Sequence, residues 1–136
     1  MRKKPYLESE RRRYIRLEPK EPVSVRFKVV EESRGSKVAA TDQAKTRSMS
    51  AGGMFLEIPL LKPEMLEGLL KGTHLLFLEI DIPDAPHPIK ALARVIWVEG
   101  EKGKKSDRYG VGVSFLSIKE DDRDKIMNYV IDTYSG

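Results

Sequence analysis

Four arginines gather within seven positions near the N-terminus, in the segment Glu10–Arg16. Only Arg12 and Arg16 among them are four residues apart. An arginine guanidinium keeps its charge at any relevant pH, and its planar fork can hold a phosphate or guanine O6 and N7 by two parallel hydrogen bonds. It can also stack on the face of a base. On a helical turn or around a bend, this pair can reach one compact anionic ligand. Taken alone, such a basic run is more often a solvated surface.

A second segment with chemical potential is Ser48-Met-Ser-Ala-Gly-Gly53. Ser48 and Ser50 alternate with Met49, so a strand would direct both hydroxyls to the same side. Gly52 and Gly53 allow a turn with positive φ and a close approach by a ligand. In isolation, an ordinary turn between two strands explains this segment more simply.

Catalytic patterns are missing from the sequence. His74 begins a predicted strand and His87 lies between prolines, and no metal-binding or nucleophile-elbow motif accompanies them. The chain has no cysteine, which excludes disulfides and thiolate metal sites. We therefore predict a protein that is not an enzyme, with no catalytic residues, no metal and no cofactor.

The positive charge is concentrated at one end of the chain. Residues 1–17 hold seven Lys or Arg against two Glu, an excess of 7 − 2 = +5, so the remainder carries 4 − 5 = −1. A basic segment on a neutral body indicates an anionic partner at that place, or else a solvated leader. No apolar run approaches the roughly 18 residues that span a bilayer, and no signal peptide is evident. We expect a cytoplasmic protein without membrane insertion.

Alternating apolar residues predict six short strands. The strand over 89–99 is expected to place Trp97 on the same face as Val95. Residues 62–72 form either one helical turn or a loop. The apolar spacing over 119–134 predicts an amphipathic helix, with acids in its first turn. The predicted strands cover 23–30, a segment ending near Arg47, 54–58, 74–82, 89–99 and 109–115.

This order of elements predicts an all-β fold, either a small barrel or a sandwich, with the final helix covering an open end. We interpret residues 1–10 as a flexible basic arm and residues 11–136 as a single domain.

In combination, these segments resemble the PilZ domain family of cyclic di-GMP receptors. The arginine pair looks like the family's opening arm, and Ser48–Gly53 looks like its second motif. Ala93–Trp97 and Tyr109–Phe115 look like its paired late strands. The similarity runs from residue 8 to residue 134.

The resemblance implies a six-stranded antiparallel β-barrel with a C-terminal α-helix and a ligand, cyclic di-GMP, on its outer surface. The arm would close over the ligand and present a surface to a downstream protein partner. Arg12 and Arg16 would contact guanine edges and phosphates, and Arg11 a second stacked ligand. Ser50 would bond to a base or its neighbourhood, and Gly53 would permit the turn. Arg94 on an adjacent strand is a further candidate.

Ser48 departs from the family pattern, which has Asp or Asn at this position. A carboxylate or amide can pair with guanine N1 and N2, whereas the shorter serine reaches through water. The loss of one charge-assisted hydrogen bond costs on the order of 1.5–3 kcal/mol, or about ten- to a hundred-fold in affinity.

Two alternatives stay open. One is a PilZ-like interaction adaptor with weak or lost cyclic di-GMP binding, for which Ser48 is the reason. The other, ranked last, is a small barrel that binds nucleic acid, since Tyr14 is the only aromatic residue in the arginine cluster and the body is not basic. The oligomeric state is also left open by the sequence, and a homodimer is one alternative.

Overall fold

The computed structural model describes residues 23–31, 37–59, 61–83, 85–99 and 108–135. Within these ranges, the side chains of residues 37–40, 47, 134 and 135 are not described. The predicted boundary between an arm and a domain at residue 10 lies outside the described residues and stays a prediction.

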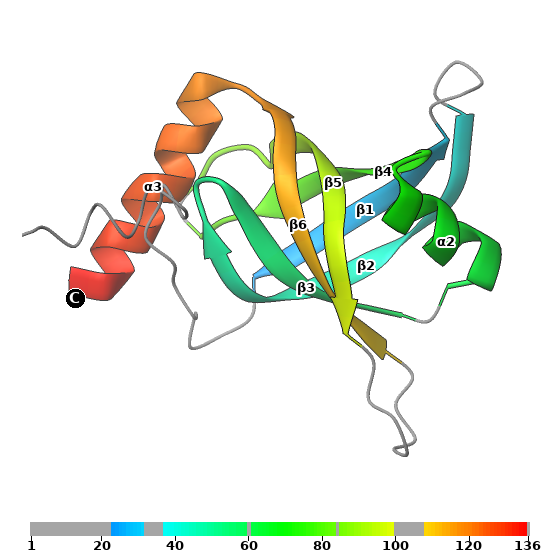
Figure 1. Ribbon diagram of the computed structural model, residues 1–136. Helices are drawn as coiled ribbons and strands as arrows, with labels where there is room; N and C mark the ends of the chain where they lie inside the picture. Colours follow the sequence, from blue (N-terminus) through cyan, green and yellow to red (C-terminus); the bar gives the residue numbers. More distant parts are fainter. Residues whose placement is uncertain (1–22, 32–36, 60, 84, 100–107, 136) are drawn as a thin grey trace, which may run out of the picture.

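Six antiparallel strands close into a barrel, in the order β1-β2-β3-β6-β5-β4 (Figure 1). This confirms the barrel and excludes the sandwich. In the described part of the chain, α2 follows the first three strands and α3 follows the last three. The elements are β1 (Ser24–Glu31), β2 (Lys37–Ser50), β3 (Gly53–Pro59), α2 (Pro63–Lys71), β4 (His74–Asp81), β5 (Ile89–Glu99), β6 (Arg108–Ile118) and α3 (Glu120–Ser135).

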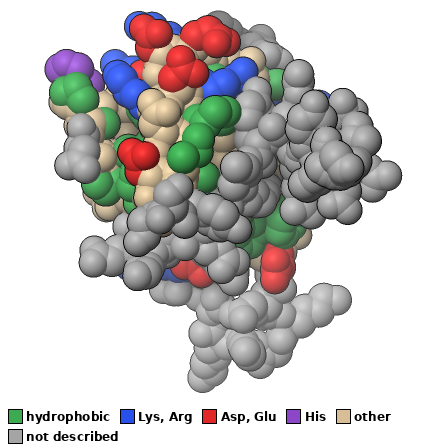
Figure 2. Space-filling model, turned by 90° about the vertical axis from the view of Figure 1, so that its left-hand side faces the viewer, with side chains coloured by type: hydrophobic (Ala, Val, Ile, Leu, Met, Phe, Trp, Pro, Cys, Tyr) green, Lys and Arg blue, Asp and Glu red, His purple; other side chains and the backbone are tan. Residues whose placement is uncertain are grey.

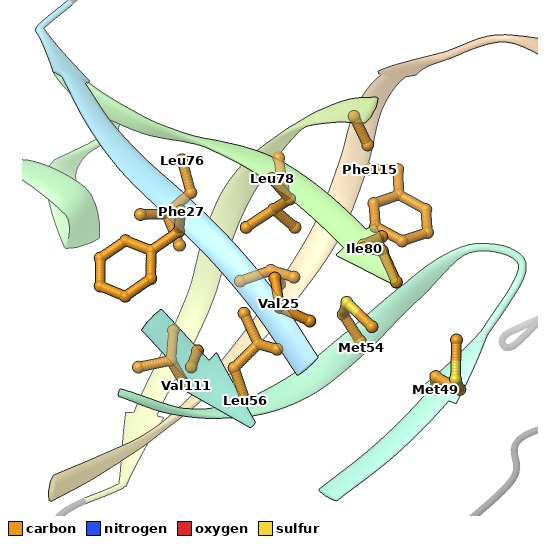
Figure 3. Packing of buried hydrophobic residues seen from close by; sticks show 14 of the residues in the cluster. Val25, Phe27, Met49, Met54, Leu56, Leu76, Leu78, Ile80, Val111 and Phe115 are labelled. Atoms are coloured by element: carbon orange, nitrogen blue, oxygen red, sulfur yellow. The ribbon is translucent and has the colours of Figure 1, made fainter. Parts of the chain in front are cut away.

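Apolar side chains fill the barrel, because alternate residues of each strand point inward (Figure 3). Large and small side chains face each other across neighbouring strands. Leu76 of β4 lies opposite Ala93 of β5, and Leu78 lies opposite Ala91. This pairing gives the leucines room in the interior, and all four residues are at most 2% exposed.

The two helices lie at opposite ends of the barrel in Figure 1. Ile126 and Val130 of α3 join the core, so this helix covers one end beside the turn between β2 and β3. The segment left open between a helical turn and a loop forms α2, a helix of nine residues. Pro63 begins it, and Gly72, with φ of 88°, ends it in the left-handed conformation.

Two details of the strands differ from prediction. β2 continues through residue 47 to Ser50, with a bulge between Thr46 and Ser48, so the first part of the Ser48–Gly53 motif belongs to the strand. Trp97 does not share the inner face of Val95, because a bulge between these two residues turns it outward. Its side chain is 45% exposed, whereas Val95 is 2% exposed.

The packing of α2 on β4 gives a test in which two effects oppose each other. A Cβ at Gly68 would lie 1.9 Å from His74 Nδ1, although alanine favours the helix by about 1 kcal/mol. The clash should dominate, so we expect Gly68→Ala to lower the free energy of unfolding by about 1–3 kcal/mol. Urea denaturation measures this change.

The matched control is the same substitution in a His74→Ala background, where the clash is absent. There Gly68→Ala should raise the free energy of unfolding, by up to about 1 kcal/mol. The same sign in both backgrounds would contradict the proposed contact.

Candidate functional site

One row of residues crosses the outer face of four strands from the turn between β2 and β3. Ser50 pairs with Gly53, Gly53 with Ser114 and Ser114 with Arg94. The strands at the centre of this row lie at the front of the barrel in Figure 1. With three strand spacings of about 4.8 Å, the row extends over about 14 Å between the backbones of Ser50 and Arg94.

A second, adjacent row carries the aromatic side chains of this face. Ser48 pairs with Phe55, Phe55 with Gly112 and Gly112 with Trp97. The rings of Phe55 and Trp97 stack across the glycine, with centroids 4.9 Å apart and an angle of 26° between their planes. Phe55 is 8% exposed and Trp97 45% exposed, so the indole forms the accessible end of this row.

The two rows place four of the predicted site residues on one outer surface. Met49 lies between Ser48 and Ser50 on β2, and it pairs with Met54 of β3. Both methionine side chains are fully buried in the core. By alternation, Ser48 and Ser50 both lie on the side of β2 opposite to Met49, so they share one side of the strand, as predicted. Ser50 is 6% exposed. The surface, which we call the β2–β5 face, therefore holds Ser48, Ser50, Gly53 and Arg94.

The hydroxyl of Ser50 braces the turn. The amide of Gly52 donates to Ser50 Oγ at 3.2 Å, and Ser50 Oγ lies 3.4 Å from the carbonyl oxygen of Gly53, to which it donates. The amide of Phe115 also donates to the carbonyl of Gly52 at 3.0 Å, which ties the turn to β6. Since the single hydroxyl hydrogen is used, Ser50 in this geometry can only accept a hydrogen bond from a ligand.

Gly53 is required for a different reason than predicted. We expected a positive φ at the Gly52–Gly53 pair, yet among the described glycines only Gly72 has one. A Cβ at Gly53 would instead lie 2.1 Å from the carbonyl oxygen of Val113. This atom belongs to the backbone of β6 and cannot move aside, so Gly53 permits close packing of β3 on β6.

Arg94 extends from the first row toward α2. Its guanidinium lies 3.7 Å from the position that a Cβ of Gly72 would take, at the C-terminal end of the helix. It forms no ion pair or hydrogen bond with any described residue. The side chain is exposed, so its charge is accessible from solvent at the edge of the β2–β5 face.

A polar clamp fixes the point where the chain enters β1. Thr46 accepts a hydrogen bond from the Val23 amide at its Oγ1 (2.9 Å), and its own amide donates to the Val23 carbonyl (3.2 Å). Thr46 is 3% exposed and lies two residues before Ser48. Val23, which directly precedes β1, therefore lies beside the part of β2 that leads to Ser48.

Arg11, Arg12 and Arg16 lie outside the described residues, so their contribution to this face stays a prediction. Trp97 and Gly112 were not predicted as site residues. The sequence signal for them is the pair of glycines at 110 and 112, on a strand adjacent to the only tryptophan. A Cβ at Gly112 would lie 2.4 Å from Trp97 Nε1, and one at Gly110 would lie 2.4 Å from Phe55 Cζ.

Metal-binding clusters and membrane-spanning helices are both absent from the described part of the chain. It holds no group of three or more His, Asp or Glu side chains that could bind a metal ion. Among the same residues, no helix is both long and apolar enough to cross a membrane.

Comparison with known proteins identifies relatives of this architecture. A family model described as the PilZ domain matches residues 10–132. The comparison with curated proteins found no match.

Solved structures provide similar folds. The Bacillus subtilis inhibitor of motility (MotI/DgrA) aligns with a TM-score of 0.66 and 19% identity, over 92% of this chain and 51% of that one. The PilZ domain of Escherichia coli YcgR with c-di-GMP aligns at 0.57 and 14% identity, over 92% of each chain. The K. pneumonia MrkH–c-di-GMP complex aligns at 0.56 and 16% identity, over 90% and 52%. This chain thus spans about half the length of MotI/DgrA and MrkH.

The contact between Gly112 and Trp97 can be tested by fluorescence, because Trp97 is the only tryptophan. In Gly112→Ala, the added methyl group displaces the indole from Phe55. We expect a red shift of the emission and stronger quenching by acrylamide. Ser117→Ala, an exposed change on the same strand, should leave both unchanged. An unaltered spectrum in Gly112→Ala would show that the glycine does not position the indole.

Proposed function

This chain belongs to the PilZ domain family, and on that premise we propose that it is a receptor for cyclic di-GMP. The observation that carries the proposal is the register of β2, β3, β6 and β5, which gathers Ser48, Ser50, Gly53 and Arg94 beside Trp97. The ligand would lie on the β2–β5 face. The receptor would bind the messenger without a catalytic step.

The chemistry of this face suits a ligand with two phosphates and two guanines. Trp97 offers an accessible ring for a guanine, and base–aromatic stacking contributes about 1–3 kcal/mol. Arg94 supplies a cation at the far end of the first row. Ser50 offers an acceptor to a guanine N–H, and Ser48 can reach one through water.

The arginine arm would complete the site from the other side. Arg16 precedes Val23 by seven residues, so the intervening chain can span at most about 25 Å when extended. Since Val23 is clamped to Thr46 near Ser48, this reach is sufficient for Arg12 and Arg16 to contact phosphates and guanine edges on the β2–β5 face. Arg11 is placed to touch a second stacked ligand and so to set the stoichiometry.

Ligand binding would be read out through the arm. Like charges repel in the free arm, and two phosphates neutralise that repulsion when the arm closes. The closed arm and the bound ligand then form a new surface for a downstream protein partner. This mechanism needs a messenger present in the same compartment, which we propose is the cytoplasm.

The arginine pair gives the direct test. We expect Arg12→Ala or Arg16→Ala to abolish measurable binding, because each removes charge-assisted contacts whose loss costs about a hundred-fold or more in affinity. Calorimetric titration with cyclic di-GMP measures the affinity and stoichiometry. The fluorescence emission of Trp97 shows in the same samples whether a guanine stacks on the indole.

Lys28→Ala is the matched control, since it removes one exposed cation from β1, a strand that carries none of the proposed site residues. It should bind like the unchanged protein. Unchanged affinity in both arginine variants, with the barrel folded, would falsify the arm mechanism.

The serine at position 48, where the family usually has Asp or Asn, favours a second candidate function. This is an interaction adaptor of the same fold with weak or lost binding of cyclic di-GMP. Ser48→Asp restores the carboxylate that is usual in the family, opposite Phe55 on the β2–β5 face. We expect it to raise the affinity for cyclic di-GMP by about ten- to a hundred-fold. Titration of the variant and the unchanged protein measures this gain.

Ser24→Asp adds the same charge on β1 and should have no effect on affinity. Sub-micromolar binding by the unchanged protein would exclude the adaptor. Absent binding in both the unchanged protein and Ser48→Asp would instead exclude the receptor.

A further inference from the structure

A second surface is a groove between α3 and the segment that joins β4 to β5. Its volume is about 420 Å³. Ile82, Ala85 and Tyr129 line its apolar part, and all three belong to or pack against the barrel core. Lys125, Asn128 and Asp132 of α3 provide polar side chains along one wall.

Both walls of this α3 groove are preorganised. On one side, Ile82 and Ala85 close a turn in which the Ala85 amide donates to the Ile82 carbonyl at 3.1 Å. Pro83 and Pro86 line the same wall, and proline restricts the backbone on either side of it. The other wall is a regular helix. A segment that docks here therefore meets walls that need little further ordering.

The charges along the helix wall favour a basic occupant. Lys125, the one cation among the described residues that line the groove, is paired with Asp122 at a distance of 3.6 Å. Asp132 forms no ion pair with any described residue. Asp121 lies four residues before Lys125, on the same side of the helix. Figure 2 views the molecule from the side that α3 covers, where acidic side chains lie close to hydrophobic ones.

We propose that the α3 groove docks an extended peptide segment of a partner protein. An aliphatic or proline side chain of this segment occupies the apolar part beside Ile82 and Tyr129. A neighbouring lysine or arginine pairs with Asp132. Among the described residues that line the groove, Asp132 is the carboxylate without an ion pair, and it lies near the apolar side chains, which suits a peptide with an apolar residue next to a basic one. This inference does not rest on messenger binding, because the groove uses α3 and the residues after β4.

The test is selection of peptides from a random heptapeptide phage library against the full chain without cyclic di-GMP. We expect the selected sequences to share an apolar residue next to lysine or arginine. Fluorescence anisotropy with the synthesised consensus peptide then gives its affinity. Asp132→Lys should weaken binding by about ten-fold, since it replaces attraction by repulsion at an exposed position.

Glu64→Lys on α2 carries the same change of net charge at the other end of the barrel and should leave the affinity unchanged. Amide chemical shifts should change at Ala85 and Asn128 when the peptide is added. An acidic or uncharged consensus, equal binding by Asp132→Lys, or no selected peptide overturns the proposal. Self-association that disappears in Asp132→Lys would assign the groove to a second copy of this chain and would also overturn it.

Discussion

The register of β3 between β2 and β6 is the constraint on which the candidate site depends. Gly53 brings the backbone of β3 so close to the Val113 carbonyl that no side chain fits between them. A slip of one residue would turn every side chain of β3 to the opposite face. Met54 would then leave the core, and Phe55 would lose Trp97. The apolar residues that hold the barrel together therefore also fix which residues face outward.

The sequence predicts most of the fold because the alternation of apolar and polar residues along a strand indicates which side chains point into the core. Val25, Phe27 and Val29 illustrate this, since each occupies an inward position and is at most 1% exposed. Trp97 is the exception to this alternation. Alternation assigns it to the inner face of Val95, but a bulge inserts one residue and reverses its side. A bulge depends on pairing with a distant strand, so a periodic pattern within one strand does not contain it.

In the candidate site, too, the sequence predicts features that depend on neighbouring residues and misses those that depend on distant ones. The alternation of Ser48 and Ser50 across Met49 is local, and it correctly predicts that both hydroxyls lie on the same side of the strand. The reason for Gly53 is a contact with a residue sixty positions later in the chain, and a local reading assigns it to turn geometry instead. The contact of Gly112 with Trp97 and the clamp between Val23 and Thr46 likewise join distant segments. Such contacts become visible only when the strands are placed side by side.

Closure of the sheet has a consequence for how this protein can respond to a ligand. Each of the six strands is hydrogen-bonded to two neighbours, so moving one strand requires breaking ladders on both of its sides. The barrel therefore resists rearrangement of its strands, and we expect it to present the same surface before and after binding. Adaptation, and the entropy that it costs, must then fall on segments attached to the barrel rather than on the barrel itself. Substitutions in those segments can tune the response while the scaffold stays unchanged.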